Sequence, residues 1–181
     1  METFTYKEIL QQPSCWIKEY EVLLEEKTRI QAFLEKYLTN ETDIVLTGAG
    51  TSAFIGDAIA PLLRGVWKNV RAVATTDIVT NAADYLAADK PLLLISFARS
   101  GNSPESVAAV NLANAICKNV AHIYITCNKN GHLAKSANAE NILSLLLPEE
   151  TDDKSLAMTS SFSTMLLTCL MISQIDHIEA E

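Results

Sequence analysis

Apolar positions along the chain follow two different spacings, and the change from one to the other predicts the elements of the fold. Across residues 13–39 they recur at helical spacing, for example at Trp16, Tyr20 and Leu24, which predicts one long helix with Pro13 in its first turn. From Asp43 onward, short apolar runs alternate with helical segments. We predict strands at 43–47, 70–74, 91–96, 120–126 and 141–146, and helices at 52–66, 77–86, 104–118, 131–137 and 159–178.

This alternation of strands and helices predicts an α/β fold with a mostly parallel sheet and helices on both faces. We divide the chain into a helical segment, residues 1–40, and an α/β domain, residues 41–181. The apolar faces of the helices at 13–39 and 159–178 favour packing against a second domain or a second subunit. Ligands of such sheets bind at the carboxyl ends of the strands, so the loops that follow the strands matter most for function.

Two of these loops are rich in small residues and hydroxyls. Residues 48–52 (Gly-Ala-Gly-Thr-Ser) follow the first strand, and residues 99–105 (Arg-Ser-Gly-Asn-Ser-Pro-Glu) follow the third. Backbone N–H groups and hydroxyls at the start of a helix can surround an anion, so two such turns on neighbouring strands favour one phosphate site. For Ser52 or Ser103 alone, a simple helix cap is an equally good explanation. The dinucleotide fingerprint and the nucleotide P-loop are both absent.

Two further loops fall at the same edge, at 126–132 and 148–154, and the second leads into a Ser/Thr-rich helix start at 159–164. Turn and capping chemistry explains such a composition, and so does contact with a polyhydroxylated ligand. We favour ligand contact for Thr159 and Ser160, because this turn follows a strand at the binding edge.

Composition and charge narrow the function. The 181 residues are 49% hydrophobic but only 7% aromatic, as suits an aliphatic core, and the net charge of −8 disfavours nucleic acid or an anionic membrane as partner. No apolar run reaches the roughly 18 residues of a membrane span, and the start of the chain lacks the pattern of a signal peptide. The four cysteines and three histidines show no metal-ligand spacing. We therefore expect a cytoplasmic protein with reduced thiols and without a metal or other cofactor.

The two turns, followed by residues 155–162 (Ser-Leu-Ala-Met-Thr-Ser-Ser-Phe), resemble the sugar isomerase (SIS) domain over about residues 40–178. More narrowly, residues 96–105 and 155–162 look like the tagatose-6-phosphate ketose/aldose isomerase group, which is associated with deaminating isomerisation of galactosamine 6-phosphate. The resemblance implies a flavodoxin-like three-layer α/β/α sandwich of about five parallel strands. Members of that group carry two SIS domains, so a second one is expected beyond the chain end.

The resemblance also implies roles for single residues. Thr51 and Ser52 would hold a phosphate from the first turn, and Ser100 and Ser103 from the second. Many members carry a further hydroxyl where this chain has Ala98, so Arg99 is expected either to grip the phosphate or to point elsewhere. The full expected phosphate site is Gly50, Thr51, Ser52, Arg99, Ser100, Gly101, Asn102 and Ser103, and Thr159 and Ser160 would contact the sugar.

Isomerisation of a sugar phosphate needs a carboxylate or imidazole that carries a proton between C2 and C1. At the right edge of the sheet the candidates are Glu149, Glu150 and His132, whereas His122 falls inside an apolar strand. In related two-domain isomerases the essential glutamate and histidine come from the second domain or a neighbouring subunit. The catalytic residues are therefore not assigned, and two readings besides an enzyme remain open: a non-catalytic sugar-phosphate sensor of a regulator, and a structural half with a degenerate site.

Overall fold

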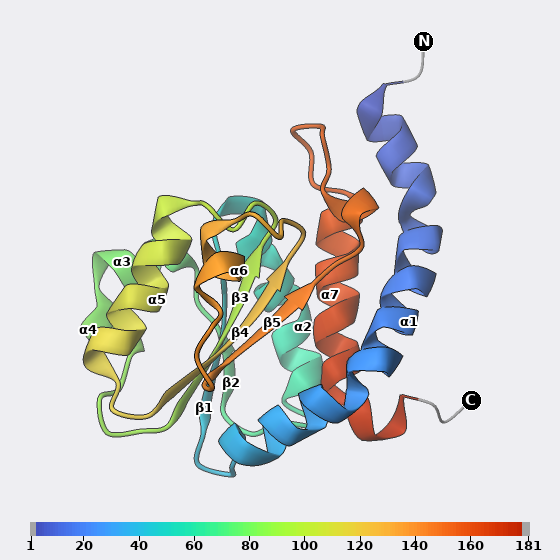
Figure 1. Cartoon of the computed structure of the whole chain (residues 1–181). Helices are drawn as coiled ribbons and strands as arrows, with labels where there is room; N and C mark the ends of the chain where they lie inside the picture. The colour runs from blue at the N-terminus through green and yellow to red at the C-terminus, as the bar shows by residue number, and fades with distance from the viewer. Residues whose placement is uncertain (1–2, 179–181) are drawn as a thin grey trace.

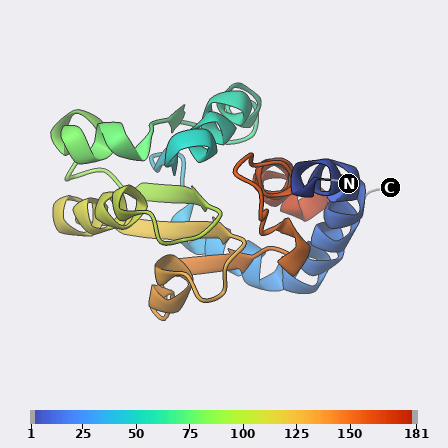
Figure 2. The ribbon, with the colours of Figure 1, turned by 90° about the horizontal axis from the view of Figure 1, so that it is seen from above.

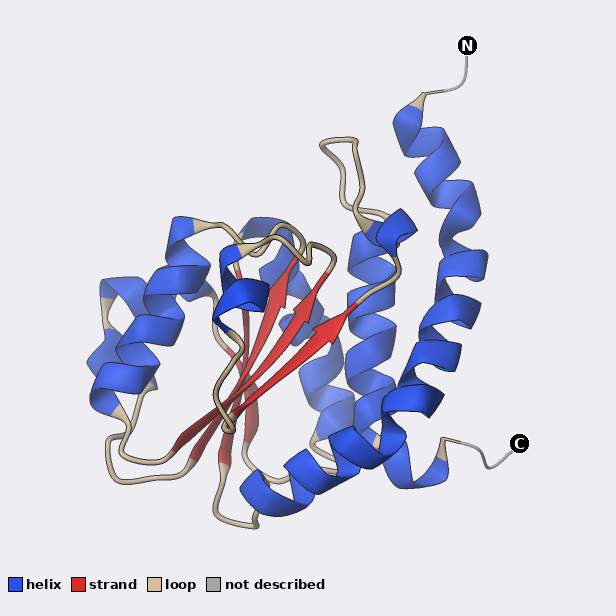
Figure 3. Cartoon of the chain, in the orientation of Figure 1, coloured by secondary structure: helices blue, strands red, loops and turns tan. Residues whose placement is uncertain are grey.

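Five parallel strands form one sheet in the computed structural model, which describes residues 3–178 (Figures 1 and 3). The spatial order is β2-β1-β3-β4-β5, the flavodoxin-like order that the family resemblance implies. The strands are β1 (Asp43–Gly48), β2 (Val70–Ala72), β3 (Leu92–Ala98), β4 (Val120–Thr126) and β5 (Ile142–Leu146). The predicted α/β/α architecture is confirmed.

Helices cover both faces of the sheet, as Figure 2 shows from above. One face packs against α1 (Phe4–Tyr37), α2 (Ala53–Leu63) and α7 (Ser160–Ser173). The other packs against α3 (Thr75–Thr80), α4 (Ala82–Tyr85), α5 (Pro104–Ile116) and α6 (His132–Ser136). Three short 3-10 helices complete the described chain: η1 (Gly50–Ser52), η2 (Glu149–Thr151) and η3 (Ile175–His177).

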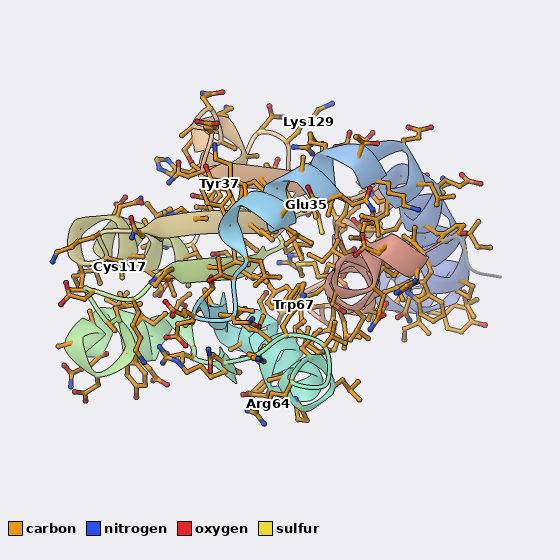
Figure 4. All side chains as sticks on the ribbon, turned by 90° about the horizontal axis from the view of Figure 1, so that it is seen from below. Glu35, Tyr37, Arg64, Trp67, Cys117 and Lys129 are labelled. Atoms are coloured by element: carbon orange, nitrogen blue, oxygen red, sulfur yellow. The ribbon has the colours of Figure 1, made fainter. Side chains whose placement is uncertain are left out.

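The central strand β3 shows why both layers form. All seven of its residues are buried; Leu93, Ile95 and Phe97 contribute to the core on the α1, α2 and α7 side, while Leu92 and Leu94 contribute to the core on the other side. A strand that is apolar on both faces needs helices on both, which is typical of parallel sheets. Figure 4, seen from below, labels Tyr37 and Trp67, and both pack in or against the first of these cores.

The long first helix begins nine residues earlier than predicted, and Pro13 lies inside it. Thr3 caps its start, since the Thr3 hydroxyl accepts the Tyr6 N–H at 3.3 Å. The proline ring leaves the Ile9 carbonyl without its usual backbone donor, and the Gln12 side-chain amide donates to that carbonyl at 3.1 Å instead. The prediction that Pro13 lies in the first turn was therefore wrong. The helix continues through Pro13 because the Gln12 side chain replaces the missing backbone N–H donor.

Two other predicted helices differ from the structure. The helix predicted at 77–86 is two short helices separated at Asn81, and the one predicted at 159–178 ends at Ser173 before η3. The apolar face of 159–178, expected to pack on a second domain or subunit, is covered by helices of this chain. α7 packs along α1 and on α2, and within residues 3–178 none of its large apolar side chains is exposed.

Candidate phosphate site

The two hydroxyl-rich turns meet at one small cavity above the sheet. β1 and β3 are neighbours in register, with Gly48 opposite Phe97, so the turns that follow them start at the same level. Between them lies a cavity of about 140 Å³, lined by Ala49, Ser52, Phe97, Ala98, Arg99, Ser100, Gly101, Ser103, Ser106 and Met158. The convergence expected from the sequence is thus present, at a size that suits an anion rather than a whole sugar.

The first turn contributes mainly Ser52. Gly50 has φ +55°, a left-handed conformation that lets the chain turn from β1 into η1. The Ser52 side chain is buried and lines the cavity, and its hydroxyl has only a weak contact with the Met158 sulfur at 3.7 Å. Thr51 is exposed, and neither Thr51 nor Gly50 lines the cavity. Ser52 is therefore the hydroxyl of this turn that is best placed to meet an anion.

The second turn opens helix α5. Gly101 has φ +64°, and the Ser103 hydroxyl accepts the Ser106 N–H at 3.3 Å as the cap of the helix. Ser103 also lines the cavity, so the same residue caps α5 and is placed to contact a ligand. Ser100 is exposed and lines the cavity as well. The second turn thus combines a helix N-terminus with hydroxyls, which is the usual anchor for phosphate.

Arg99 lies at the edge of this cavity and is half-buried. Its Nη1 donates to the Ser155 carbonyl at 3.2 Å, which fixes one side of the guanidinium to the loop before α7. The side chain does not simply extend into solvent. Phosphate binding by Arg99 stays a prediction, and the contact with Ser155 leaves its other N–H groups for such a role.

The loop after β4 supports the second turn from outside. The side chain of Asn128 donates to the Ser100 carbonyl at 3.0 Å, and the Leu133 N–H donates to the Gly101 carbonyl at 3.2 Å. Asn102 does not line the cavity; its side-chain oxygen instead accepts the His132 N–H at 2.9 Å. Asn102 and the 128–133 loop therefore hold the turn in shape.

Thr159 and Ser160 have structural partners. Asp153 caps α7, since its carboxylate accepts the backbone N–H groups of Thr159, Ser160 and Ser161 at 2.8 to 3.1 Å. The Thr159 hydroxyl also donates to Asp153, at 3.1 Å, while the Ser160 hydroxyl is fully buried and donates to the Glu8 carbonyl at 2.7 Å. Sugar contact by these two residues stays a prediction, and this geometry favours the capping alternative.

Of the three candidate catalytic residues, Glu149 and Glu150 line one groove beside α1, whereas His132 lies apart from them. Glu149 lines a groove of about 460 Å³ with Cys127 and Asp152, whereas His132 lines a separate cavity beside α5. Glu150 forms an ion pair with Lys18, and the hydrogen bond from that ammonium lowers the pKa of Glu150. A base for proton transfer at carbon needs a pKa nearer neutrality, so Glu150 is poorly suited.

Sequence reasoning missed three residues near the site. Ser106 and Met158 line the cavity, and Asp152 lies in the groove with Glu149, where burial raises the pKa of the Asp152 carboxyl and the charge of Arg99 lowers it. Ser106 could have been found as a hydroxyl in the first turn of α5. Met158 lies within the 155–162 motif but was not singled out, because a methionine before a helix is ordinarily a core residue.

Within residues 3–178, no three His, Cys, Asp or Glu side chains are grouped so that they could hold a metal ion. The four cysteines are free and buried. None of the helices in this described part of the chain is both long and apolar enough to cross a membrane.

The fold and the cavity together define an α/β domain with a small cavity at the carboxyl ends of two adjacent strands. Residues 37–173 match the SIS domain family, and the chain belongs to that family.

The chain is similar to enzymes that act on amino-sugar or keto-sugar phosphates. It is 52% identical over 173 residues to D-galactosamine-6-phosphate deaminase AgaS of Escherichia coli, a match covering 94% of this chain and 45% of the relative. A putative AgaS of Streptomyces coelicolor is 44% identical over 92% of this chain and 44% of its own length. The crystal structure of tagatose-6-phosphate ketose/aldose isomerase from Escherichia coli superposes with a TM-score of 0.93 at 50% identity, covering 97% of this chain and 49% of that one. The chain thus spans about half the length of these relatives.

Proposed function

We propose that this chain is the sugar-phosphate-binding SIS domain of an aldose–ketose isomerase that converts galactosamine 6-phosphate to tagatose 6-phosphate and ammonia. The observation that carries the proposal is the cavity between Ser52 of the first turn and Ser100 and Ser103 of the second. The relatives named for galactosamine-6-phosphate deaminase and tagatose-6-phosphate isomerase supply the substrate class.

In this reaction the phosphate acts as a handle. The turns hold it at a distance from the reacting carbons, so that its binding energy orients C1 and C2 of the open sugar. A base removes the proton at C2, a proton is returned to C1, and water replaces the nitrogen at C2 as ammonia leaves. Because Glu149, Glu150 and His132 do not converge beside the cavity, we propose that the proton-transfer groups come from a second SIS domain or from a partner copy.

We propose that the protein acts in the cytoplasm on a small-molecule sugar phosphate. We propose neither nucleic acid nor membrane as a partner, because the net charge of −8 is repelled by both of these negatively charged surfaces. An anionic substrate is then held by the local groups of the two turns rather than by the field of the whole protein.

The test is calorimetric titration of the 181-residue chain with galactosamine 6-phosphate, and with galactosamine as the ligand without phosphate. We expect Ser52→Ala and Ser100→Ala each to weaken binding roughly tenfold or more, since a hydrogen bond to a charged group contributes about 1.5–3 kcal/mol. Ser173→Ala is the matched control, because that hydroxyl bonds to the Leu170 carbonyl at the far end of α7.

Ammonia release is measured in the same samples. Binding that requires the phosphate and collapses in both variants, without ammonia, supports a phosphate site whose proton-transfer groups lie outside this chain. Turnover by the chain alone would place the base within it, and attention would then return to the acidic groove at Glu149 and Asp152. A folded chain that binds no hexose 6-phosphate would contradict the proposal.

A further inference from the structure

Residues 152–158, which lie between η2 and α7, contact both phosphate turns and are called the bridging segment here. The Ser155 carbonyl accepts the Arg99 guanidinium of the second turn at 3.2 Å. The Met158 sulfur receives the Ser52 hydroxyl of the first turn at 3.7 Å. Arg99, Ser52 and Met158 all line the cavity, so the position of the bridging segment determines part of its shape.

One buried carboxylate of the first helix holds this segment. Glu8 is only 5% exposed, and its Oε1 accepts the Lys154 N–H at 2.7 Å and the Ser155 N–H at 3.1 Å. Its Oε2 accepts the Ser155 hydroxyl. Within residues 3–178, the hydrogen bonds of this carboxylate therefore go to two consecutive residues of the bridging segment. Figure 1 shows the loop before α7 rising beside the first turns of α1.

Ser155 is the link between Glu8 and the cavity. Its N–H and hydroxyl face the carboxylate, while its carbonyl accepts Arg99, so the two contacts share one residue. An arginine side chain has many rotamers, and an anion gains most from it when the guanidinium is already held in place. Without these donors the negative charge of the buried Glu8 carboxylate would have no hydrogen-bond partner, which is strongly destabilising. The fold therefore keeps Ser155 and Lys154 against this carboxylate.

We propose that Glu8 is a positioning residue for phosphate binding: through Ser155 it holds Arg99 at the cavity, and so couples the first helix to the anion site. The inference rests on the proposed function, because it assigns Arg99 to the phosphate of the same substrate. Glu8 itself does not line the cavity.

A double-mutant cycle tests the coupling, with galactosamine 6-phosphate as the probe in calorimetric titration of the full chain. We expect Glu8→Gln to weaken binding roughly tenfold when Arg99 is present, and less than about twofold in an Arg99→Ala background, in line with the coupling of residues in one hydrogen-bond network. Glu25→Gln, an exposed carboxylate on the same helix, is the control and leaves affinity unchanged. A residue that merely stabilised the fold would weaken binding equally in both backgrounds.

Ser155→Ala provides a second route if Glu8→Gln fails to fold. It removes the hydroxyl that bonds to Glu8 but keeps the carbonyl that accepts Arg99, and we expect a loss of roughly threefold that also disappears in the Arg99→Ala background. Equal losses with and without Arg99 would overturn this inference alone. Absence of binding by the folded wild-type chain would overturn the proposed function, and the inference with it.

Discussion

Because Gly131 has no side chain, the loop after β4 packs closely against the second phosphate turn. A Cβ atom at this position would lie 2.4 Å from the Ser100 carbonyl oxygen and 3.2 Å from the Gly101 Cα. Both neighbours are backbone atoms, which cannot rotate away as a flexible side chain would. A methyl group at this position therefore requires the turn or the loop after β4 to shift, so the geometry of the phosphate site depends on a residue that does not line it.

We therefore expect Gly131→Ala to weaken binding of galactosamine 6-phosphate by tenfold or more while the chain stays folded. Overpacking of this kind costs about 1–3 kcal/mol and falls on the turn that holds Ser100. Titration calorimetry and the melting temperature, measured on the same sample, separate loss of the site from loss of the fold.

Gly65→Ala is the matched control for this substitution. An added Cβ there meets only the Leu62 carbonyl at 3.2 Å, just beyond the end of α2. If both variants bind equally well, the turn tolerates the displacement and the packing argument for Gly131 is wrong.

At the scale of elements, the interface between α1 and α7 contains a buried carboxyl group, Glu19. The Thr168 hydroxyl lies 2.8 Å from Glu19 Oε1 and 2.8 Å from the Thr164 carbonyl. A hydroxyl has one proton, so if it goes to the carbonyl the contact with Glu19 needs a proton on the carboxyl group. Burial raises the pKa of Glu19 to about 8, consistent with a neutral acid between the helices at neutral pH.

This proton makes the pairing of the two helices depend on pH. An unfolded chain loses the Glu19 proton near the ordinary value of 4.5, whereas the folded chain keeps it up to about 8. Between these values the folded state binds more protons, so the free energy of unfolding falls as pH rises through this window. Glu19→Gln removes the titration and keeps a donor for Thr168. We expect its melting temperature, relative to wild type, to rise by at least about 3 °C from pH 5 to pH 8, because about 1 kcal/mol shifts the melting temperature of such a domain by 2–4 °C.

Thermal unfolding at matched ionic strength measures this, with Glu25→Gln on the exposed face of α1 as control. A difference between Glu19→Gln and wild type that does not change with pH would mean that Glu19 is already ionised in the folded state.

Elements with a strong periodic signal were predicted well, and the exceptions have physical causes. β4 was predicted with the same bounds that it has in the structure, Val120–Thr126, because its apolar run ends at clear turn residues. The start of α1 was missed because Thr3 and Gln12 act through their side chains, which periodicity does not read. Both phosphate turns were found from their small residues and hydroxyls. Met158 and Glu8 were not, since contacts across 106 and 147 positions of the chain leave no local pattern.

At the scale of the whole molecule, α1 presents two different faces. Glu8, Cys15, Glu19 and Leu23 are buried at spacings of seven and four residues, along the side that packs on α7. Another side carries exposed apolar residues at similar spacing: Tyr6, Leu10 and Ile17, with Ile9 and Trp16 beside them. A helix with a second apolar stripe is normally covered by another protein surface.

We expect a second copy of this chain to cover the stripe when the chain is studied alone, since isologous pairing lets one apolar surface bury its own equivalent. Light scattering after gel filtration should then give twice the 19.8 kDa of one chain at high concentration and a lower mass on dilution. Ile17→Asp, at a side chain 63% exposed, should give a single chain with little change in melting temperature, because most of the Ile17 side chain is already solvated in the monomer. Leu62→Asp, equally exposed at 64% but on α2, should leave the mass unchanged. Dissociation by Leu62→Asp instead would place the interface on α2, and one mass at all concentrations would show that the stripe does not pair with itself.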